Sequence, residues 1–301
     1  MKNLLSLLIV FVFLSSQEKA FLVVLGNAQD AGAPQAMCQK DCCKERWEKG
    51  IRHYATSLAL IDPNTKTYYL FEATPDFKYQ FAHVQKNYPA FRLAGIFLTH
   101  AHVGHYAGLI HLGREIVGAK SVPVFVMPNM ARYLTNNGPW SQLVDLKNIL
   151  LIKMTDEEKQ NLSRDLSVTP FRVPHRDEFS ETVGYNITFE NKTVFFIPDI
   201  NKWSAWEKSL TKLVKNSHVS ILDASFYSDK ELPGRNMSEI PHPFVPETMA
   251  LLNGLSNKEK SKVLFIHFNH TNPLLNINSD EYKLTLSKFY KIAKFSDIIT
   301  F

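Results

Sequence analysis

The stretch that decides the fold is Ile96-Phe-Leu-Thr-His100-Ala-His102-Val-Gly-His105. An apolar strand pattern leads directly into three histidines within six residues. The spacing of Leu109, Leu112 and Ile116 behind them predicts a helix over residues 106–118. A loop between a strand and a helix presents its side chains at a sheet edge, where ligands gather in α/β folds. Imidazole groups bind zinc, iron or manganese, so this stretch predicts a metal site.

Further potential metal ligands also stand at the ends of apolar strand patterns. They are His175, Asp199, Asp223 and His267. Because strand ends meet along one edge of such a sheet, we expect these side chains to lie near the first histidines.

The order of predicted elements indicates one α/β domain over residues 21–301. Strand patterns at 54–62 and 66–72 form a predicted hairpin, and helical patterns such as 281–294 alternate with strands throughout. This alternation is typical of two sheets inside and helices outside. The proline-rich loop 227–246 is long enough to be functional.

Residues 1–20 are predicted to be a secretory signal peptide or an N-terminal anchor. Lys2 precedes the apolar run 4–14, and small and polar residues follow it. The run is shorter than the roughly 20 residues that a membrane span needs. We therefore expect an exported protein, periplasmic or extracellular, with membrane attachment only if the segment is retained.

Composition and charge argue against a disordered or nucleic-acid-binding chain. Apolar residues make up 45% and charged residues 21%, which allows a buried core. The net charge of +5 is spread along the chain, with no basic block and no basic groove interleaved with aromatic residues. A small-molecule substrate is expected, and the oligomeric state stays open.

The chain has three cysteines, Cys38, Cys42 and Cys43. An odd, clustered set cannot pair completely within one chain, and adjacent cysteines rarely bond because the geometry is strained. Three thiols this close fit a metal ion better than a disulfide framework.

The sequence resembles the metallo-β-lactamase superfamily, which carries a His-x-His-x-Asp-His loop and then a histidine, an aspartate and a final histidine. The resemblance implies a four-layer αββα sandwich with a two-ion site on the sheet edge. Carried over, the first ion takes His100, His102 and His175, the second takes His105 and His267, and Asp199 bridges both.

Longer blocks resemble the coenzyme PQQ synthesis protein B group, which is related to the phosphodiesterase of phosphonate breakdown. They include Val24-Leu-Gly-Asn-Ala-Gln-Asp-Ala-Gly-Ala-Pro-Gln35, Asp223-Ala-Ser-Phe-Tyr227 and His267-Phe-Asn-His-Thr-Asn-Pro273. This resemblance implies a structural Zn²⁺ in addition to one or two catalytic ions, which are zinc with iron or manganese as alternatives. The structural ligands would be Cys38, Cys42, Cys43 and His270.

The chain departs from these families in two ways. Gly104 stands where the superfamily usually has aspartate, which removes a carboxylate from the second ion. The PQQ group often lacks the first histidines of the loop, whereas this chain keeps His100 and His102. The number of catalytic ions and the type of reaction therefore stay open.

Other polar residues have expected roles around the ions. Asp199 would also orient the nucleophile, and His242 would donate a proton to a leaving group or bind a substrate anion. Asp223 would orient a ligand histidine. Arg176 and Arg235 would bind a carboxylate or phosphate.

The leading hypothesis is a metal-dependent hydrolase that uses metal-activated water on an ester, lactone or phosphodiester. An iron-dependent oxygenase of the PQQ-biosynthesis type and a non-catalytic metal-binding protein are the alternatives.

Overall fold

The structure, a computed structural model, describes residues 19–301, the side chain of Ser238 excepted. The predicted signal peptide or anchor over residues 1–20 thus lies almost entirely outside the described residues. Within residues 19–301, no helix has the length and apolar character needed to cross a membrane.

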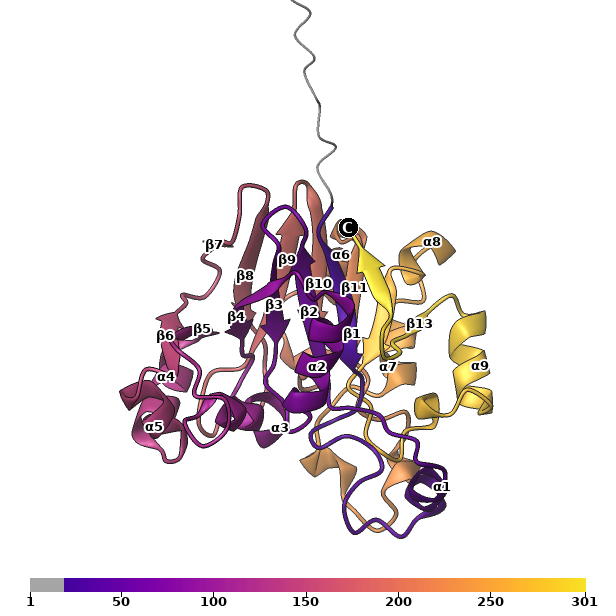
Figure 1. The fold of residues 1–301 in the computed structure, drawn as a ribbon. Helices are drawn as coiled ribbons and strands as arrows, with labels where there is room; N and C mark the ends of the chain where they lie inside the picture. Colours follow the sequence, from indigo (N-terminus) through magenta and orange to yellow (C-terminus); the bar gives the residue numbers. More distant parts are fainter. Residues whose placement is uncertain (1–18) are drawn as a thin grey trace, which may run out of the picture.

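Two seven-stranded sheets form the centre of the molecule (Figure 1). The first sheet contains, in spatial order, β14 (Ile298–Thr300), β1 (Phe21–Gly26), β2 (Ser57–Asp62), β3 (Thr67–Phe71), β4 (Arg92–Phe97), β5 (Val122–Val126) and β6 (Ile149–Lys153). The second contains β13 (Lys291–Ile292), β12 (Val263–Ile266), β11 (Val219–Asp223), β10 (Lys192–Ile197), β9 (Val183–Phe189), β8 (Leu166–Arg172) and β7 (Gln160–Asn161).

Helices and short 3-10 turns surround these sheets. The α-helices are α1 (Asp41–Lys49), α2 (Phe77–Asn87), α3 (Val103–Tyr106), α4 (Pro128–Asn136), α5 (Trp140–Asp145), α6 (Leu210–Asn216), α7 (Val245–Leu251), α8 (Asn257–Lys260) and α9 (Asp280–Ser287). The 3-10 turns are η1 (Ala107–Leu112), η2 (Trp203–Ala205), η3 (Asp229–Glu231), η4 (Met237–Glu239) and η5 (Pro273–Leu275).

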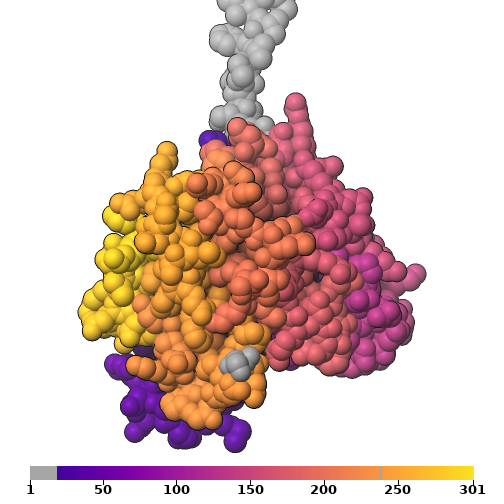
Figure 2. Space-filling view, turned by 180° about the vertical axis from the view of Figure 1, so that it is seen from behind, coloured from indigo at the N-terminus to yellow at the C-terminus, as the bar shows by residue number. Residues whose placement is uncertain are grey.

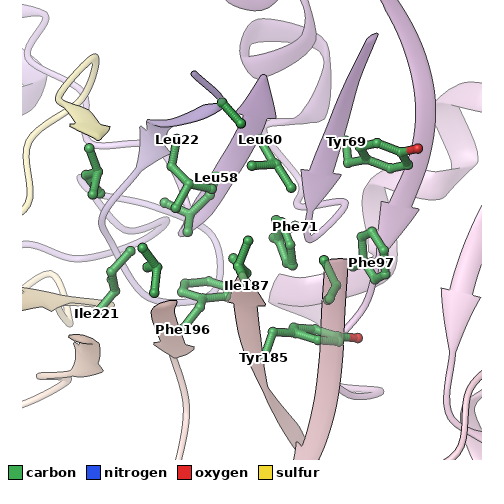
Figure 3. Close-up of a cluster of buried hydrophobic side chains, with 14 of the residues drawn as sticks. Leu22, Leu58, Leu60, Tyr69, Phe71, Phe97, Tyr185, Ile187, Phe196 and Ile221 are labelled. Carbon is green, nitrogen blue, oxygen red and sulfur yellow. The ribbon is translucent and has the colours of Figure 1, made fainter. Parts of the chain in front are cut away.

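The central core lies between the two sheets (Figure 3). Leu58 and Phe71 of the first sheet face Ile187 and Phe196 of the second, and all are fully buried. Phe71 packs edge-on against Phe196, with ring centroids 5.9 Å apart. Side chains alternate along each strand, so the other face of each sheet must also be covered.

Helices bury those outer faces. Val84 of α2 and Leu134 of α4 belong to one cluster with the outer face of the first sheet. Val214 of α6 and Val245 of α7 pack with the outer face of the second. Three apolar clusters between four layers make the αββα sandwich that the sequence predicts.

The direction of the strands determines which edge of the sandwich carries the candidate site. Strands β3, β4, β5 and β6 run parallel, as do β10, β11, β12 and β13. Their carboxyl ends therefore lie along one edge of the sandwich. The loop after β1 joins the two sheets at this edge, because Ala28 forms parallel bridges with both Ala55 and Phe268.

Two predicted helices are shorter in the structure. The stretch 106–118 is not one helix: α3 ends at Tyr106, η1 ends at Leu112, and the chain turns beyond it. Gly113 takes an extended conformation directly after η1, and Gly118, with a φ of 55°, continues the turn. The predicted helix 281–294 ends at Ser287, and Phe289, with a φ of 69°, turns the chain into β13.

We expect Ile187→Ala to lower the free energy of unfolding by about 2–5 kcal/mol, because it leaves a cavity between the sheets. Ile298→Ala removes the same atoms where the side chain is 61% exposed, so it should change stability by roughly 0.5 kcal/mol or less. Urea unfolding at a fixed zinc concentration measures both. Equal effects would contradict the assignment of the central core.

Candidate metal centre

Three imidazoles converge where β4, β8 and β10 end. His102 Nδ1 lies 2.9 Å from His100 Nε2 and 3.2 Å from His175 Nε2. Nitrogen ligands about 2.0–2.1 Å from a tetrahedral zinc ion are separated by about 3.4 Å. The three nitrogens are therefore spaced much like the edges of such a site.

Contacts on the far side of two rings orient them. His102 Nε2 donates to the Glu178 carboxylate at 2.9 Å, and His175 Nδ1 lies 3.2 Å from Asn201 Oδ1. Burial lowers the pKa of His102, so this ring is neutral and its Nδ1 presents a lone pair. Burial also holds the pKa of His100 well below its usual value, and the three near nitrogens face one another, so these residues fit a metal ion.

Asp199 closes this group. Its Oδ2 lies 3.3 Å from both His100 Nε2 and His175 Nε2, and 3.7 Å from His105 Nε2. Burial alone would raise the pKa of Asp199, but His175 and His242 beside it hold that pKa well below its usual range. The carboxylate is thus anionic at neutral pH and lies between the first histidines and His105, as a bridging ligand would.

A second group faces the first. His105 and His267 are fully buried, and His105 Nε2 and His267 Nε2 have no hydrogen-bond partner among the described residues. Burial lowers the pKa of His267 to about 4, so the ring is neutral at pH 7. Its Nδ1 donates to Ser225 Oγ at 2.9 Å, which leaves a lone pair on Nε2. Buried, unpartnered lone pairs are costly unless a cation satisfies them.

Glu72 sets the orientation of His105. Its Oε1 lies 3.4 Å from His105 Nδ1, and both side chains are buried. Burial disfavours protonation of His105, but the charge of Glu72 outweighs it and raises the pKa of the histidine. The ring therefore faces Glu72 with Nδ1 and Asp199 with Nε2, which lies 3.7 Å from Asp199 Oδ2.

Position 104 carries no carboxylate, but the structure places another carboxylate near the second group. Ligand atoms of Asp30, His105 and His267 lie within 4.8 Å of one another. Gly104 packs directly against Asp30, because a Cβ at residue 104 would lie 2.5 Å from Asp30 Cα. The missing side chain at 104 thus makes room for a carboxylate from elsewhere in the chain.

Backbone strain gathers in the same place. Three residues of the site have φ angles in the left-handed region, which residues other than glycine rarely adopt: Asp30 at 46°, Glu72 at 75° and His267 at 68°. Such conformations persist where the surrounding structure enforces them, and they concentrate at functional sites.

His242 lies beside the metal ligands. Its Nδ1 donates to Asp223 Oδ2 at 2.8 Å and lies 3.4 Å from Asp199 Oδ1. Burial disfavours the charged ring, but the carboxylates of Asp223 and Asp199 outweigh this and raise the pKa of His242 to about 9. The structure thus places a protonated imidazole next to the candidate metal site.

Asp223 serves two histidines. Its Oδ2 accepts from His242, and its Oδ1 accepts from Ser225 Oγ at 2.8 Å. Because the Ser225 hydroxyl proton goes to Asp223, the Ser225 oxygen accepts from His267 Nδ1. The expected orienting role of Asp223 is therefore exerted on His267 through Ser225 and on His242 directly.

A cavity of about 260 Å³ opens beside His242. Asp30, Arg176, Arg235 and His242 line it, and Glu239 contributes a second carboxylate. Arg176 also makes an exposed ion pair with Glu178, which holds His102. Both predicted substrate-binding arginines thus lie on the same cavity wall as His242.

The cysteines form a separate cluster with His270. The ligand atoms of Cys38, Cys42, Cys43 and His270 lie within 4.8 Å of one another. The Sγ atoms of Cys42 and Cys43 are 4.0 Å apart, close to the roughly 3.8 Å expected around a tetrahedral zinc ion. All three thiols are free, so the cluster fits one metal ion.

The N-terminal segment that carries the cysteines lies beside the segment that includes the loop 227–246; Figure 2 shows the two in indigo and orange. Lys40 Nζ donates to the Glu231 carbonyl, and Arg46 donates to the carbonyls of Cys42 and His270. The cysteine segment is thus tied to the loop 227–246 and to His270, which lines the cavity.

Sequence patterns did not identify Asp30, Glu72, Glu178 or Ser225 as parts of the site. Glu72 directly follows a strand, as the expected ligands do, and this position could have identified it as a site residue. The other three lie in loops whose path only the folded chain defines.

The fold and the clustered imidazoles define a class of protein that holds metal ions at the shared edge of an αββα sandwich. The chain belongs to the beta-lactamase superfamily, whose Beta-lactamase superfamily domain matches residues 67–268.

Its relatives narrow this placement. Coenzyme PQQ synthesis protein B of Acinetobacter baylyi is 25% identical over 290 residues, 86% of this chain and 92% of that protein. The same protein of Klebsiella pneumoniae is 26% identical over 289 residues, 85% of this chain and 90% of that protein.

Solved structures share the fold. Zn²⁺-bound PqqB from Methylobacterium extorquens has a TM-score of 0.78 at 20% identity, covering 93% of this chain and 100% of its own. A diphosphatase from the PhnP family has a TM-score of 0.66 at 19% identity, covering 94% and 98%.

Gly104→Ala should lower stability by about 1–3 kcal/mol, because its Cβ would meet the Asp30 backbone. Gly254→Ala is the matched control, since a Cβ there has nothing within 4 Å. Thermal midpoints of the two variants make the comparison. A midpoint for Gly104→Ala equal to that of the control would contradict the close packing.

Proposed function

We propose that the protein is a metal-dependent hydrolase acting on a small, negatively charged ester, lactone or phosphodiester. The observation that carries this proposal is the Asp223–His242 pair. It places a proton donor on the wall of a cavity and 3.4 Å from Asp199, one of the candidate metal ligands. Hydrolysis needs a nucleophile on one side of the scissile bond and an acid on the other.

A zinc ion bound here, or iron or manganese, supplies a Lewis acid and a water whose pKa is lowered to about 7. His100, His102 and His175 would hold the first ion, His105 and His267 the second, and Asp199 would contact both.

The protein side chains do the remaining work. His242 donates a proton to the leaving group, and Asp223 keeps the ring oriented. Asp199 orients the nucleophile through its second oxygen. Arg176 and Arg235, on the cavity wall, bind the substrate anion and bring it towards the buried ligands.

We also propose that Cys38, Cys42, Cys43 and His270 hold a structural zinc ion. The closed set of three thiolates and one imidazole leaves no position for a substrate. We further propose that the protein is exported and acts on a small-molecule substrate. The N-terminal sequence pattern supports export, and N-terminal sequencing of the mature protein would test it.

The double variant His100→Ala/His102→Ala should lose zinc from the sheet-edge site and lower turnover by at least about a hundredfold, because it removes the ligands that position the nucleophile. It should keep the zinc held by the cysteines. Metal analysis together with assays on ester, lactone and phosphodiester substrates measures both effects.

His218→Ala is the control, since His218 is an exposed histidine away from the site. Full activity in the double variant would end the hydrolase proposal. Turnover that requires iron and dioxygen would favour the oxygenase, and zinc binding without turnover would favour a binding protein.

Cys42→Ser should lose one zinc equivalent and lower the thermal midpoint by several degrees, because metal binding contributes to folding free energy. Lys44→Ser, at an exposed position of the same helix, should change neither the zinc content nor the thermal midpoint. Unchanged zinc content in Cys42→Ser would remove the structural site.

A further inference from the structure

We propose that Asp30 is a ligand of the second metal ion and takes the place of the aspartate that position 104 lacks. This assignment rests on the proposed two-ion site and goes beyond the ligands that family resemblance supplies. Three independent observations carry it: a fixed loop, an exclusive packing arrangement and buried imidazole nitrogens without hydrogen-bond partners among the described residues.

The loop that carries Asp30 is fixed by backbone hydrogen bonds. Gln29 N donates to the Phe268 carbonyl at 2.8 Å, and Phe268 N donates to the Asn27 carbonyl at 2.8 Å. Gly32 N closes a turn onto the Gln29 carbonyl at 3.0 Å. Asp30 lies inside this turn, so its position is tied to the residue that follows His267.

Position 104 and Asp30 exclude each other. A Cβ at residue 104 would lie 2.9 Å from Asp30 Oδ1 and 3.0 Å from the Asp30 carbonyl, besides the close approach to Cα. The Asp30 carboxylate therefore occupies the region in which a side chain at 104 would begin. An aspartate at 104 would need Asp30 to move, and the glycine allows Asp30 to approach.

The ligand set is then complete. His105 Nε2 and His267 Nε2 are buried and unpartnered, and the Asp30 carboxylate lies within 4.8 Å of these imidazoles. With Asp199, they form a set of two nitrogens and two carboxylates, a combination that suits zinc, iron or manganese. Asp30 also restores the negative charge that the glycine removes.

The exposure of Asp30 fits this role. Its side chain lines the cavity rather than the core, so it faces the space where substrate enters. A ligand on the open side can hold an ion while leaving a coordination position accessible, as catalytic sites require.

The experiment compares Asp30→Asn with Glu239→Gln in the full-length protein. Both changes remove one negative charge from the same cavity and keep the side-chain shape, but Glu239 is not grouped with the metal-ligand atoms. Zn²⁺ is titrated into chelator-treated protein by calorimetry, and metal content is measured at a fixed free-zinc concentration.

We expect Asp30→Asn to lower the affinity for the more weakly bound sheet-edge zinc ion by at least about tenfold. At the fixed free-zinc concentration, this variant should contain one zinc equivalent fewer than Glu239→Gln. The cysteine-bound equivalent should remain in both variants. Wild-type affinity in Asp30→Asn would overturn the assignment. Equal losses in both variants would overturn it too, because they would report only the charge of the cavity.

Failure of the proposed function would look different. If Asp30→Asn loses zinc while the wild type turns over no ester, lactone or phosphodiester, Asp30 remains a ligand and the hydrolase proposal fails. If zinc binding is unchanged and the wild type is active, the hydrolase stands and Asp30 is not a ligand.

Discussion

The candidate site depends on imidazole nitrogens that point at one another at the shared edge of the two sheets. An acceptor on the far side fixes the proton of two of these rings, Glu178 for His102 and Ser225 for His267. The near nitrogens of these two rings present lone pairs, which a cation would satisfy. The sandwich brings the ends of two sheets together and holds these rings despite the strain at His267 and Glu72.

The N-terminal segment links the two sheets at this edge. Ala28 bridges to both sheets, Asp30 reaches the second imidazole pair, and the cysteines beyond it meet His270. In this arrangement Gly104 is a contact surface for the Asp30 loop, not simply a lost ligand. Gly104, which stands where the superfamily motif has aspartate, therefore packs against Asp30, which lies some seventy positions earlier in the chain.

The layers and much of the site could be predicted because strand patterns carry period-2 signals, and His100, His175, Asp199 and His267 each follow such a strand. Loop paths carry no comparable signal, so Asp30 could not be placed near His105 from sequence alone. The helix predicted over residues 106–118 was wrong because Gly113 leaves the helical conformation after η1, and hydrophobic periodicity does not report such a turn. Residue roles within the site stay predictions.

Asp223 has a consequence for how variants of this protein should be interpreted. One of its oxygens accepts from Ser225, which orients the candidate metal ligand His267, and the other accepts from His242, the proposed proton donor. A substitution at 223 perturbs both groups at once, so its kinetic effect is not the sum of two separable effects. Asp223 therefore acts on both groups. Double-mutant cycles that combine changes at 223 with changes at 225 and 242 would separate its effect on metal binding from its effect on protonation of the leaving group.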